Sequence, residues 1–282
     1  MKTGGKYLSS KLVQSILNNK NYSIDISLFK CINIILDSIK NFSFHWRVIN
    51  LSSFNKGIKS TKMKFKKIFM SKTKNKYWDN FYKSFEKSDK KDIPPSQFAA
   101  FCSLELMHSN IDQIVEIAAG EGRDSIFFAK QGFHTIALDK SINALNLIRK
   151  KESLVKTLKT IKIDAVNEDL PLPIFPEKLC AYYARFFIHT LEENDLKIFF
   201  WKLSSSMKNK DVLFVEYRND NDETLDKAMP DHFRKFYKAN FVKELAEKNG
   251  LVCSYEVSGK GYAKWNIDDA HVTRQIFIKE TD

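Results

Sequence analysis

The sequence is poor in cysteine, and the few cysteines it has are scattered. Four occur among 282 residues, with no CxxC pair and no Cys/His cluster: Cys31, Cys102, Cys180 and Cys253. This spacing argues against a zinc site and against a disulfide framework, so we expect a protein of a reducing cytosol. Carboxylates are plentiful but form no recognisable ligand set, and we expect no metal.

Long hydrophobic runs are also missing. No apolar run approaches the roughly 20 residues that a membrane-spanning helix needs, and no apolar core of signal-peptide length precedes position 20. Nevertheless, 43% of the residues are hydrophobic, which is enough for the sizeable core of one large domain, alone or with an appendage.

Negative charge is scarce in the first third of the chain. Residues 1–90 hold 19 Lys and Arg against five Asp and Glu, whereas residues 91–282 hold 27 against 29. Residues 56–76 carry nine lysines and no acidic residue. Such a run is typical of a solvated surface or a linker. Contact with an anionic membrane surface, a polyanionic glycan or nucleic acid is the alternative.

The pattern of apolar residues divides the chain into three parts. We expect a helical appendage in residues 1–55, a lysine-rich linker in 56–76 and an α/β domain in 77–282. In the last part, strand-like and helical segments alternate, which predicts a mostly parallel seven-stranded sheet with helices on both faces. The final two strands have no helix between them, so they should form an antiparallel hairpin. The expected strands are residues 111–117, 134–139, 160–165, 178–184, 211–217, 251–257 and 273–279.

A glycine-rich turn follows the first expected strand. It reads E-I-A-A-G-E-G-R-D over residues 116–124. Ligands bind at the carboxyl ends of strands in such sheets, and Gly120 and Gly122 let the backbone approach a ligand closely. A dinucleotide fingerprint would leave the helix N-terminus free for a pyrophosphate. The acids Glu116 and Asp124 would repel a pyrophosphate but suit a ligand that carries an ammonium and a sulfonium group.

This pattern resembles the class I S-adenosylmethionine-dependent methyltransferases, although Ala118 replaces their usual first glycine. The resemblance implies a Rossmann-like fold, S-adenosylmethionine as the cofactor and methyl transfer as the activity. It also implies that Asp139 holds the ribose, while Asp164 and Ala165 hold the adenine. The expected cofactor-binding residues are Trp78, Ser96, Glu116, Ala118, Gly120, Gly122, Arg123, Asp124, Asp139, Lys140, Asp164, Ala165 and Tyr183.

Other segments are similar to a bacterial subgroup of these methyltransferases found in surface-polysaccharide and lipopolysaccharide biosynthesis. They span about residues 77–279 and include YWDNFY, PPSQFAAF, YYARFFIHTL, FVEYRNDND, DHFRKF and GYAKWNIDDAHVTRQIFIK. The resemblance implies a saccharide, phosphorylated small molecule or glycolipid as the methyl acceptor. It implies a cytoplasmic enzyme, with the basic N-terminal region as a candidate contact to the inner membrane face or to a glycosyltransferase.

Two histidines are candidates for removing a proton from a hydroxyl acceptor. His189 lies just after the fourth expected strand, and His232 lies in the polar stretch after the fifth. A structural hydrogen bond near the cofactor is the alternative for His189.

Arginines near these histidines favour an anionic acceptor, because a guanidinium group matches carboxylate and phosphate geometry. A phosphoryl oxygen would need no general base. The alternative is that each arginine pairs with Glu216, Asp220 or Asp222. The expected catalytic residues are His189, His232, Arg185 and Arg218, and Arg234 and Arg274 join these four as expected substrate-binding residues.

Aromatic residues before the glycine turn are candidates for a lid over the cofactor: Tyr77, Trp78, Phe81 and Tyr82. Ordinary core packing is the alternative for Trp78 and Phe81, because aromatic residues at helical spacing usually belong to a core. Ser96 either contacts the carboxylate of the cofactor or caps the helix that follows Pro94-Pro95.

Two other functions stay open. An RNA methyltransferase would use the basic arm to track phosphates. Nucleic acid is nevertheless disfavoured, because YYARFFIHT differs from the N/D-P-P-F/Y tetrad of amino-nitrogen methylases and no paired catalytic cysteine is present. A catalytically weak scaffold of the same fold would instead bind a glycan-assembly partner.

Overall fold

The structure is a computed structural model, and it describes residues 77–84, 94–152, 155–228, 232–265 and 267–280. All of these residues belong to one compact unit. The helical appendage and the lysine-rich linker predicted for residues 1–76 lie outside the described residues. No helix among the described residues is long and apolar enough to cross a membrane.

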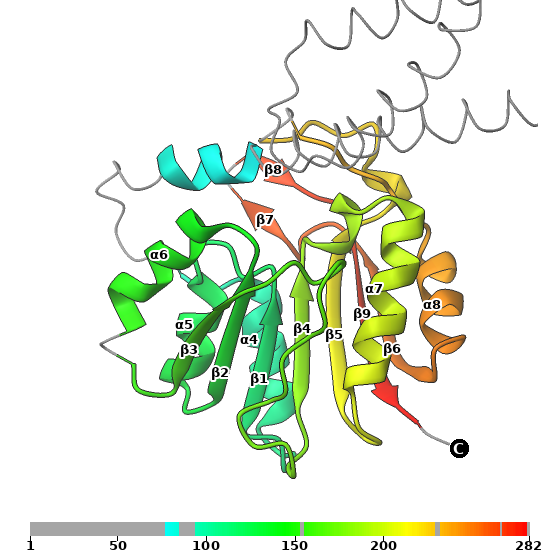
Figure 1. Ribbon diagram of the computed structural model, residues 1–282. Helices are drawn as coiled ribbons and strands as arrows, with labels where there is room; N and C mark the ends of the chain where they lie inside the picture. The colour runs from blue at the N-terminus through cyan, green and yellow to red at the C-terminus, as the bar shows by residue number, and fades with distance from the viewer. Residues whose placement is uncertain (1–76, 85–93, 153–154, 229–231, 266, 281–282) are drawn as a thin grey trace, which may run out of the picture. The chain divides into compact units, whose positions relative to one another are not determined.

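A seven-stranded sheet forms the centre of the described fold (Figure 1). In spatial order its strands are β3 (Leu158–Lys162), β2 (His134–Asp139), β1 (Gln113–Ile117), β4 (Ala181–Arg185), β5 (Val212–Arg218), β9 (Val272–Lys279) and β6 (Leu251–Gly259). Strands β1 to β5 are parallel, and β9 runs antiparallel to both β5 and β6. This confirms the predicted parallel sheet with its C-terminal antiparallel hairpin.

Helices cover both faces of the sheet, as predicted (Figure 1). One face carries α4 (Gln97–Leu106), α5 (Arg123–Lys130) and α6 (Ile142–Glu152), and the other carries α7 (Glu193–Ser206) and α8 (Ala239–Glu247). Strand β1 shows why both faces are apolar, because successive side chains of a strand point to opposite faces. Val115 and Ile117 pack in the core under α7 and α8, whereas Ile114 packs in the core under α4 and α5.

Four short elements stand at the carboxyl ends of the parallel strands. A helix over residues 77–84 (cyan in Figure 1) was expected from its aromatic spacing. The small sheet of β7 (Lys264–Trp265) and β8 (Asp268–Asp269) was not, because its two-residue strands carry no periodic signal. Two 3-10 turns, Ile188–Thr190 and Asp220–Asp222, follow β4 and β5.

The boundaries predicted for the third strand were wrong by two residues at its start and three at its end. The expected strand covered residues 160–165, but β3 ends at Lys162 because its register is set by pairing with β2, which ends opposite it at Asp139. Asp164 instead caps the next turn, where its carboxylate accepts the backbone N–H of Val166 at 3.1 Å. Asp164 and Ala165 therefore lie in a loop at the carboxyl edge of the sheet.

Candidate functional site

The glycine-rich turn after β1 packs closely against the end of β2. The N–H of Gly120 donates to Oδ2 of Asp139 at 2.9 Å, and the N–H of Ala119 donates to the carbonyl of Leu138 at 2.9 Å. Gly120 and Gly122 both have positive φ angles, of 58° and 76°. A side chain at either position would be strained, so the turn needs glycine at both.

Ala118 also has a left-handed backbone, with φ at 58°. This is the position where the resembling family usually has its first glycine. A non-glycine residue in this region costs about 1–2 kcal/mol. Ala118 therefore holds a left-handed conformation that usually favours glycine.

Glu116 is a buried acid that links β1 to α5. Ser125 donates a hydrogen bond to its carboxylate, and only 4% of Glu116 is exposed. Burial raises the pKa of Glu116 well above its usual range, and the nearby negative charge of Asp124 raises it further. Because its carboxylate is already held by Ser125, Glu116 fixes the start of α5 beneath the glycine turn.

Asp124 is held by two other predicted cofactor-binding residues. Its carboxylate accepts hydrogen bonds from the backbone N–H and the hydroxyl of Ser96, both at 2.7 Å, and from the hydroxyl of Tyr183 at 2.8 Å. Ser96 also caps α4 by accepting the N–H of Ala99 at 3.0 Å, so the alternative role as an N-cap is the observed one. These contacts make Asp124, Ser96 and Tyr183 supports of the loop in this structure.

Asp139 stands at the end of β2, where its Oδ2 faces the glycine loop. Its second contact is the N–H of Ser141, which donates to Oδ1 at 2.8 Å. Burial raises the pKa of Asp139, although the two backbone hydrogen bonds oppose this shift. A cavity of about 280 Å³ opens beside it, lined by Trp78, Asp79, Lys140, Ser141, Lys162, Ile163, Asp164 and Glu168. The structure thus brings Lys140, Asp164 and Trp78 together around one cavity, and their role in cofactor binding stays a prediction.

The helix over residues 77–84 lies against the glycine turn. A Cβ atom added to Gly120 would come within 2.6 Å of the hydroxyl oxygen of Tyr82. Burial raises the pKa of the Tyr82 phenol well above its usual range, and the nearby carboxylates of Asp139 and Glu121 raise it further. Ser141 donates a 2.5 Å hydrogen bond to Asp79 of the same helix. These contacts hold the helix against the glycine turn, and its role as a lid over the cofactor stays a prediction.

A row of charged side chains crosses three neighbouring strands. Glu216 of β5 pairs in register with Arg185 of β4 and Arg274 of β9. Its two carboxylate oxygens each accept a 2.8 Å hydrogen bond from one arginine Nε, and Glu216 is fully buried. The alternative left open by the sequence, an ion pair with Glu216, is therefore observed for Arg185 and Arg274, and substrate binding by these arginines stays a prediction. Both pair with Glu216, because register places the three residues side by side.

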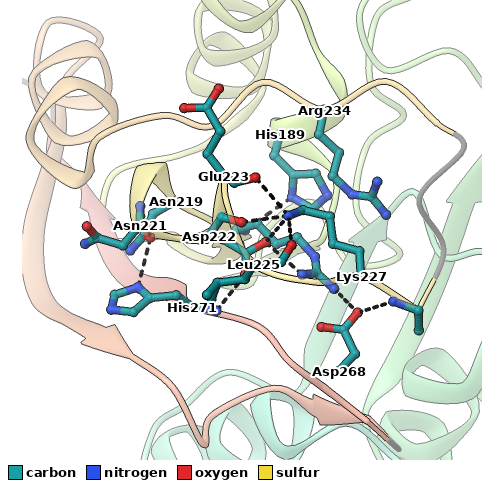
Figure 2. A network of polar contacts seen from close by, with 12 residues as sticks. His189, Asn219, Asn221, Asp222, Glu223, Leu225, Lys227, Arg234, Asp268 and His271 are labelled. Atoms are coloured by element: carbon teal, nitrogen blue, oxygen red, sulfur yellow. Dashed lines mark hydrogen bonds and ion pairs between the residues drawn. The ribbon is translucent and has the colours of Figure 1, made fainter.

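Arg218 is likewise held by carboxylates, in the network of Figure 2. It donates to Asp222 at 2.7 Å and to Asp268 at 2.5 Å. Asp222 is fully buried and also accepts the backbone N–H of His271. The ammonium group of Lys227 donates to the carbonyl of Asp222 at 2.7 Å. Arg218 is thus a structural clamp between β5, the loop after it and β8, and its expected catalytic role is not supported.

His189 is buried under this network, with 2% of its surface exposed. Its Nδ1 accepts the backbone N–H of Arg218 at 3.3 Å. The neutral ring then carries its proton on Nε2, so it can donate there but cannot accept a proton. Burial holds its pKa well below the usual range, and Arg218 and Arg234 lower it further. The structure argues against His189 as a general base, because its lone pair is already used.

His232 is half-buried and packs on the helix over residues 77–84. Its ring centroid lies 4.9 Å from that of Trp78 and 5.6 Å from that of Tyr77. Burial lowers its pKa to about 4, with Arg234 and Arg218 contributing repulsion. Nη1 of Arg234 lies 3.5 Å from the carbonyl of His232. The structure therefore brings His232, Arg234 and Trp78 together, although the sequence separates Trp78 from the others by about 150 residues.

Sequence reasoning missed several residues of this region. The sequence predicted Glu216 only as an alternative ion-pair partner of the arginines. It gave no prediction for Asp268, Lys227 or Phe186. Phe186 has a positive φ of 54° and lies between two arginines, with the Arg185 guanidinium 4.2 Å from its ring centroid. A local signal existed only for Phe186, whose aromatic side chain directly follows a buried strand. Arg123, a predicted cofactor residue, lies under the ring of Trp265 at 5.4 Å.

Two further features of the described residues bear on the search for a site. A larger cavity, of about 360 Å³, lies at the amino ends of β2 and β3, where it is lined by His134 and Leu158 among others. That edge is opposite to the glycine turn, so we assign it no part in the site. The described residues contain no group of His, Cys, Asp and Glu that could hold a metal ion.

Comparison with known proteins gives the fold. No model of a protein family matches the chain, and no curated protein matches it. Among solved structures, the methyltransferase CcbJ from Streptomyces caelestis has a TM-score of 0.56 at 12% identity, covering 73% of this chain and 98% of its own. An S-adenosylmethionine-dependent methyltransferase from Clostridium acetobutylicum has a TM-score of 0.54 at 12% identity, covering 72% and 99%.

A third similar structure contains a bound nucleoside. It is the glycopeptide N-methyltransferase MtfA in complex with S-adenosyl-L-homocysteine, with a TM-score of 0.50 at 11% identity, covering 68% of this chain and 90% of its own. At these identities the likeness concerns the fold alone. The described residues therefore have the Rossmann-like fold of S-adenosylmethionine-dependent methyltransferases.

Proposed function

We propose that the chain is an S-adenosylmethionine-dependent methyltransferase. The observation that carries this proposal is the joint placement of the glycine turn and Asp139. Gly120 and Gly122 give the turn its left-handed backbone, and the buried carboxylate of Asp139 accepts the N–H of Gly120. The residues that follow Asp139, Lys140 and Ser141, line a cavity at the same edge of the sheet. These residues fit a nucleoside with a cationic tail, because the acids around the turn would repel a pyrophosphate. When bound, the cofactor supplies an activated methyl group.

We further propose that the acceptor is an oxygen of an anionic saccharide or phosphorylated compound in surface glycan biosynthesis. The segment resemblance over residues 77–279 supports this acceptor class. The positive charge at the ends of β4 and β5 is weaker support for an anionic acceptor. Arg185, Arg218 and Arg274 each form an ion pair with a buried carboxylate there. Arg234 and Lys227 add positive charge to the same region. An anionic acceptor would meet a net positive field there.

A calorimetric titration tests the cofactor assignment. We expect the full-length chain to bind S-adenosylmethionine and S-adenosylhomocysteine, and Asp139→Ala to abolish binding because the ribose would lose its carboxylate. Asp169→Ala is the matched control, since Asp169 is an exposed acid outside the cavity. Absence of binding by the wild type would refute the proposal, and equal binding by Asp139→Ala would refute the role of Asp139.

The acceptor class is tested separately by transfer of a tritiated methyl group. The panel contains sugar phosphates, uronic acids, the matching neutral sugars and lipopolysaccharide fragments. We expect label in the anionic members. Labelling of neutral sugars alone, or of RNA, would refute the proposed acceptor while leaving the cofactor assignment intact.

A further inference from the structure

The two histidines of the site are held in opposite protonation patterns. His189 accepts a backbone N–H at Nδ1 and so carries its proton on Nε2. Nδ1 of His232 lies 3.2 Å from the carbonyl oxygen of Phe233. A carbonyl oxygen can only accept, so Nδ1 of His232 is the protonated nitrogen and Nε2 keeps its lone pair. Of the two rings, only His232 can receive a proton at Nε2.

His232 lies between the cofactor cavity and the turns that follow β4 and β5. Its ring packs on Trp78, which lines the cavity beside Lys140 and Asp164 at the ends of β2 and β3. Three residues further on, the N–H of Lys235 donates to the carbonyl of His189 at 2.7 Å, which ties this segment to the turn after β4. His232 therefore lies between the cofactor cavity and the carboxyl ends of β4 and β5.

We propose that Nε2 of His232 takes the proton of a hydroxyl acceptor. This inference rests on the proposed function. In the step, the acceptor O–H bond breaks and its proton goes to His232. The oxygen forms the new bond to the methyl carbon, and the electron pair of the broken carbon–sulfur bond stays on sulfur. The inference selects a hydroxyl over a phosphoryl oxygen, which has no proton to remove.

The charges around His232 favour this assignment with an anionic acceptor. Arg234 and Arg218 face the ring from the polar segment and from β5, and Tyr77, Trp78 and His189 are further neighbours among the described residues. The two arginines and burial keep the ring neutral at pH 7, so its lone pair is available. A negative charge bound beside the arginines would offset their repulsion and raise the pKa of His232 as it receives the proton.

Nuclear magnetic resonance tests the protonation pattern without any acceptor. Long-range ¹H–¹⁵N spectra of the full-length chain with ¹⁵N-labelled histidine report which ring nitrogen is protonated, and single histidine variants assign the signals. At pH 7, with and without S-adenosylhomocysteine, we expect His232 to be protonated on Nδ1 and His189 on Nε2. A proton on Nε2 of neutral His232, or a doubly protonated ring, would overturn the proposal.

A kinetic comparison then separates a proton acceptor from a structural residue. His232→Gln keeps a polar side chain but cannot take a proton, so we expect methyl transfer to the hydroxyl members of the acceptor panel to fall by about 10²–10⁴-fold. Its Kd for S-adenosylhomocysteine should stay within about twofold of the wild type. His134→Gln, at the opposite edge of the sheet, is the matched control and should transfer normally.

The outcomes distinguish this inference from the proposed function. Near wild-type transfer by His232→Gln would overturn the role of His232 even if S-adenosylhomocysteine binds normally. Failure of the wild type to bind S-adenosylhomocysteine would instead remove the methyltransferase assignment, and the chemistry proposed for His232 with it. The protonation pattern in the spectra would still show whether the geometry was interpreted correctly.

Discussion

Glu216→Gln is the substitution for which the structure makes the sharpest stability prediction. Glu216 is fully buried, and its two oxygens each accept a 2.8 Å hydrogen bond from Arg185 and Arg274. Gln keeps the shape of the side chain but removes the negative charge. It also turns an N–H₂ group toward one of the two guanidinium groups. Two arginines would then share a buried environment without their counter-ion.

The expected cost is large compared with the stability of a typical domain. Removing one partner of a buried ion pair costs about 3–5 kcal/mol, against a total unfolding free energy of about 5–15 kcal/mol. Urea denaturation measures it. With a slope of about 2–3 kcal/mol per molar urea, we expect the midpoint to fall by roughly 1–2.5 M. The slope itself should not change, because the surface exposed on unfolding stays the same.

Two variants make the result interpretable. Glu193→Gln breaks an exposed pair with Lys197 and should leave the midpoint unchanged. Adding Arg274→Met to Glu216→Gln removes one of the two uncompensated charges and packs an apolar chain near the rings of Phe98 and Phe101. The double variant should therefore be more stable than Glu216→Gln alone. A cost below about 1 kcal/mol for Glu216→Gln would refute the inferred ion-pair row.

Two other predictions concern the glycine turn and the pH dependence. Gly122→Ala would place a Cβ atom 2.5 Å from Cγ1 of Ile148 at a positive φ, so we expect a loss of about 2–4 kcal/mol in thermal unfolding. In Gly132→Ala no atom lies within 4 Å of the added Cβ, so the unfolding free energy should fall only by the cost of the left-handed backbone. Equal losses in the two variants would contradict the packing argument. His232 has a folded-state pKa of about 4, so below pH 6.5 the unfolded chain takes up its proton first. We therefore expect the wild type to lose stability relative to His232→Gln as the pH is lowered from 6.5 to 4. A difference in unfolding free energy that does not change with pH would rule out the buried neutral ring.

Most of the fold could be predicted from the sequence because its signals are local. Alternating apolar strands and helical segments, and the absence of a helix before the last strand, are features of short stretches of chain. The glycine turn was predictable for the same reason, since glycine is the residue that adopts the positive φ angles of Gly120 and Gly122 without strain. The end of β3 was not predicted, because register against β2 sets it.

The partners of charged groups were beyond the sequence. The alternative that the arginines pair with nearby carboxylates was open for Arg185, Arg218 and Arg274, and each position fitted both a binding role and a structural one. Sheet register decided the matter by placing Glu216 between Arg185 and Arg274. The second partner of Arg218, Asp268, lies 50 residues away and meets it only through the fold.

The sequence by itself determined the parallel sheet, its terminal hairpin, the glycine turn and the carboxylate at the end of β2, because each depends on a few neighbouring residues. Only the tertiary structure decided which arginines are neutralised and which histidine keeps a lone pair at Nε2. The protonated nitrogen of a histidine depends on the hydrogen bond that its ring makes, and for His189 that bond comes from Arg218, 29 residues away on another strand. Such contacts are fixed by packing and register, which no local pattern of residues encodes.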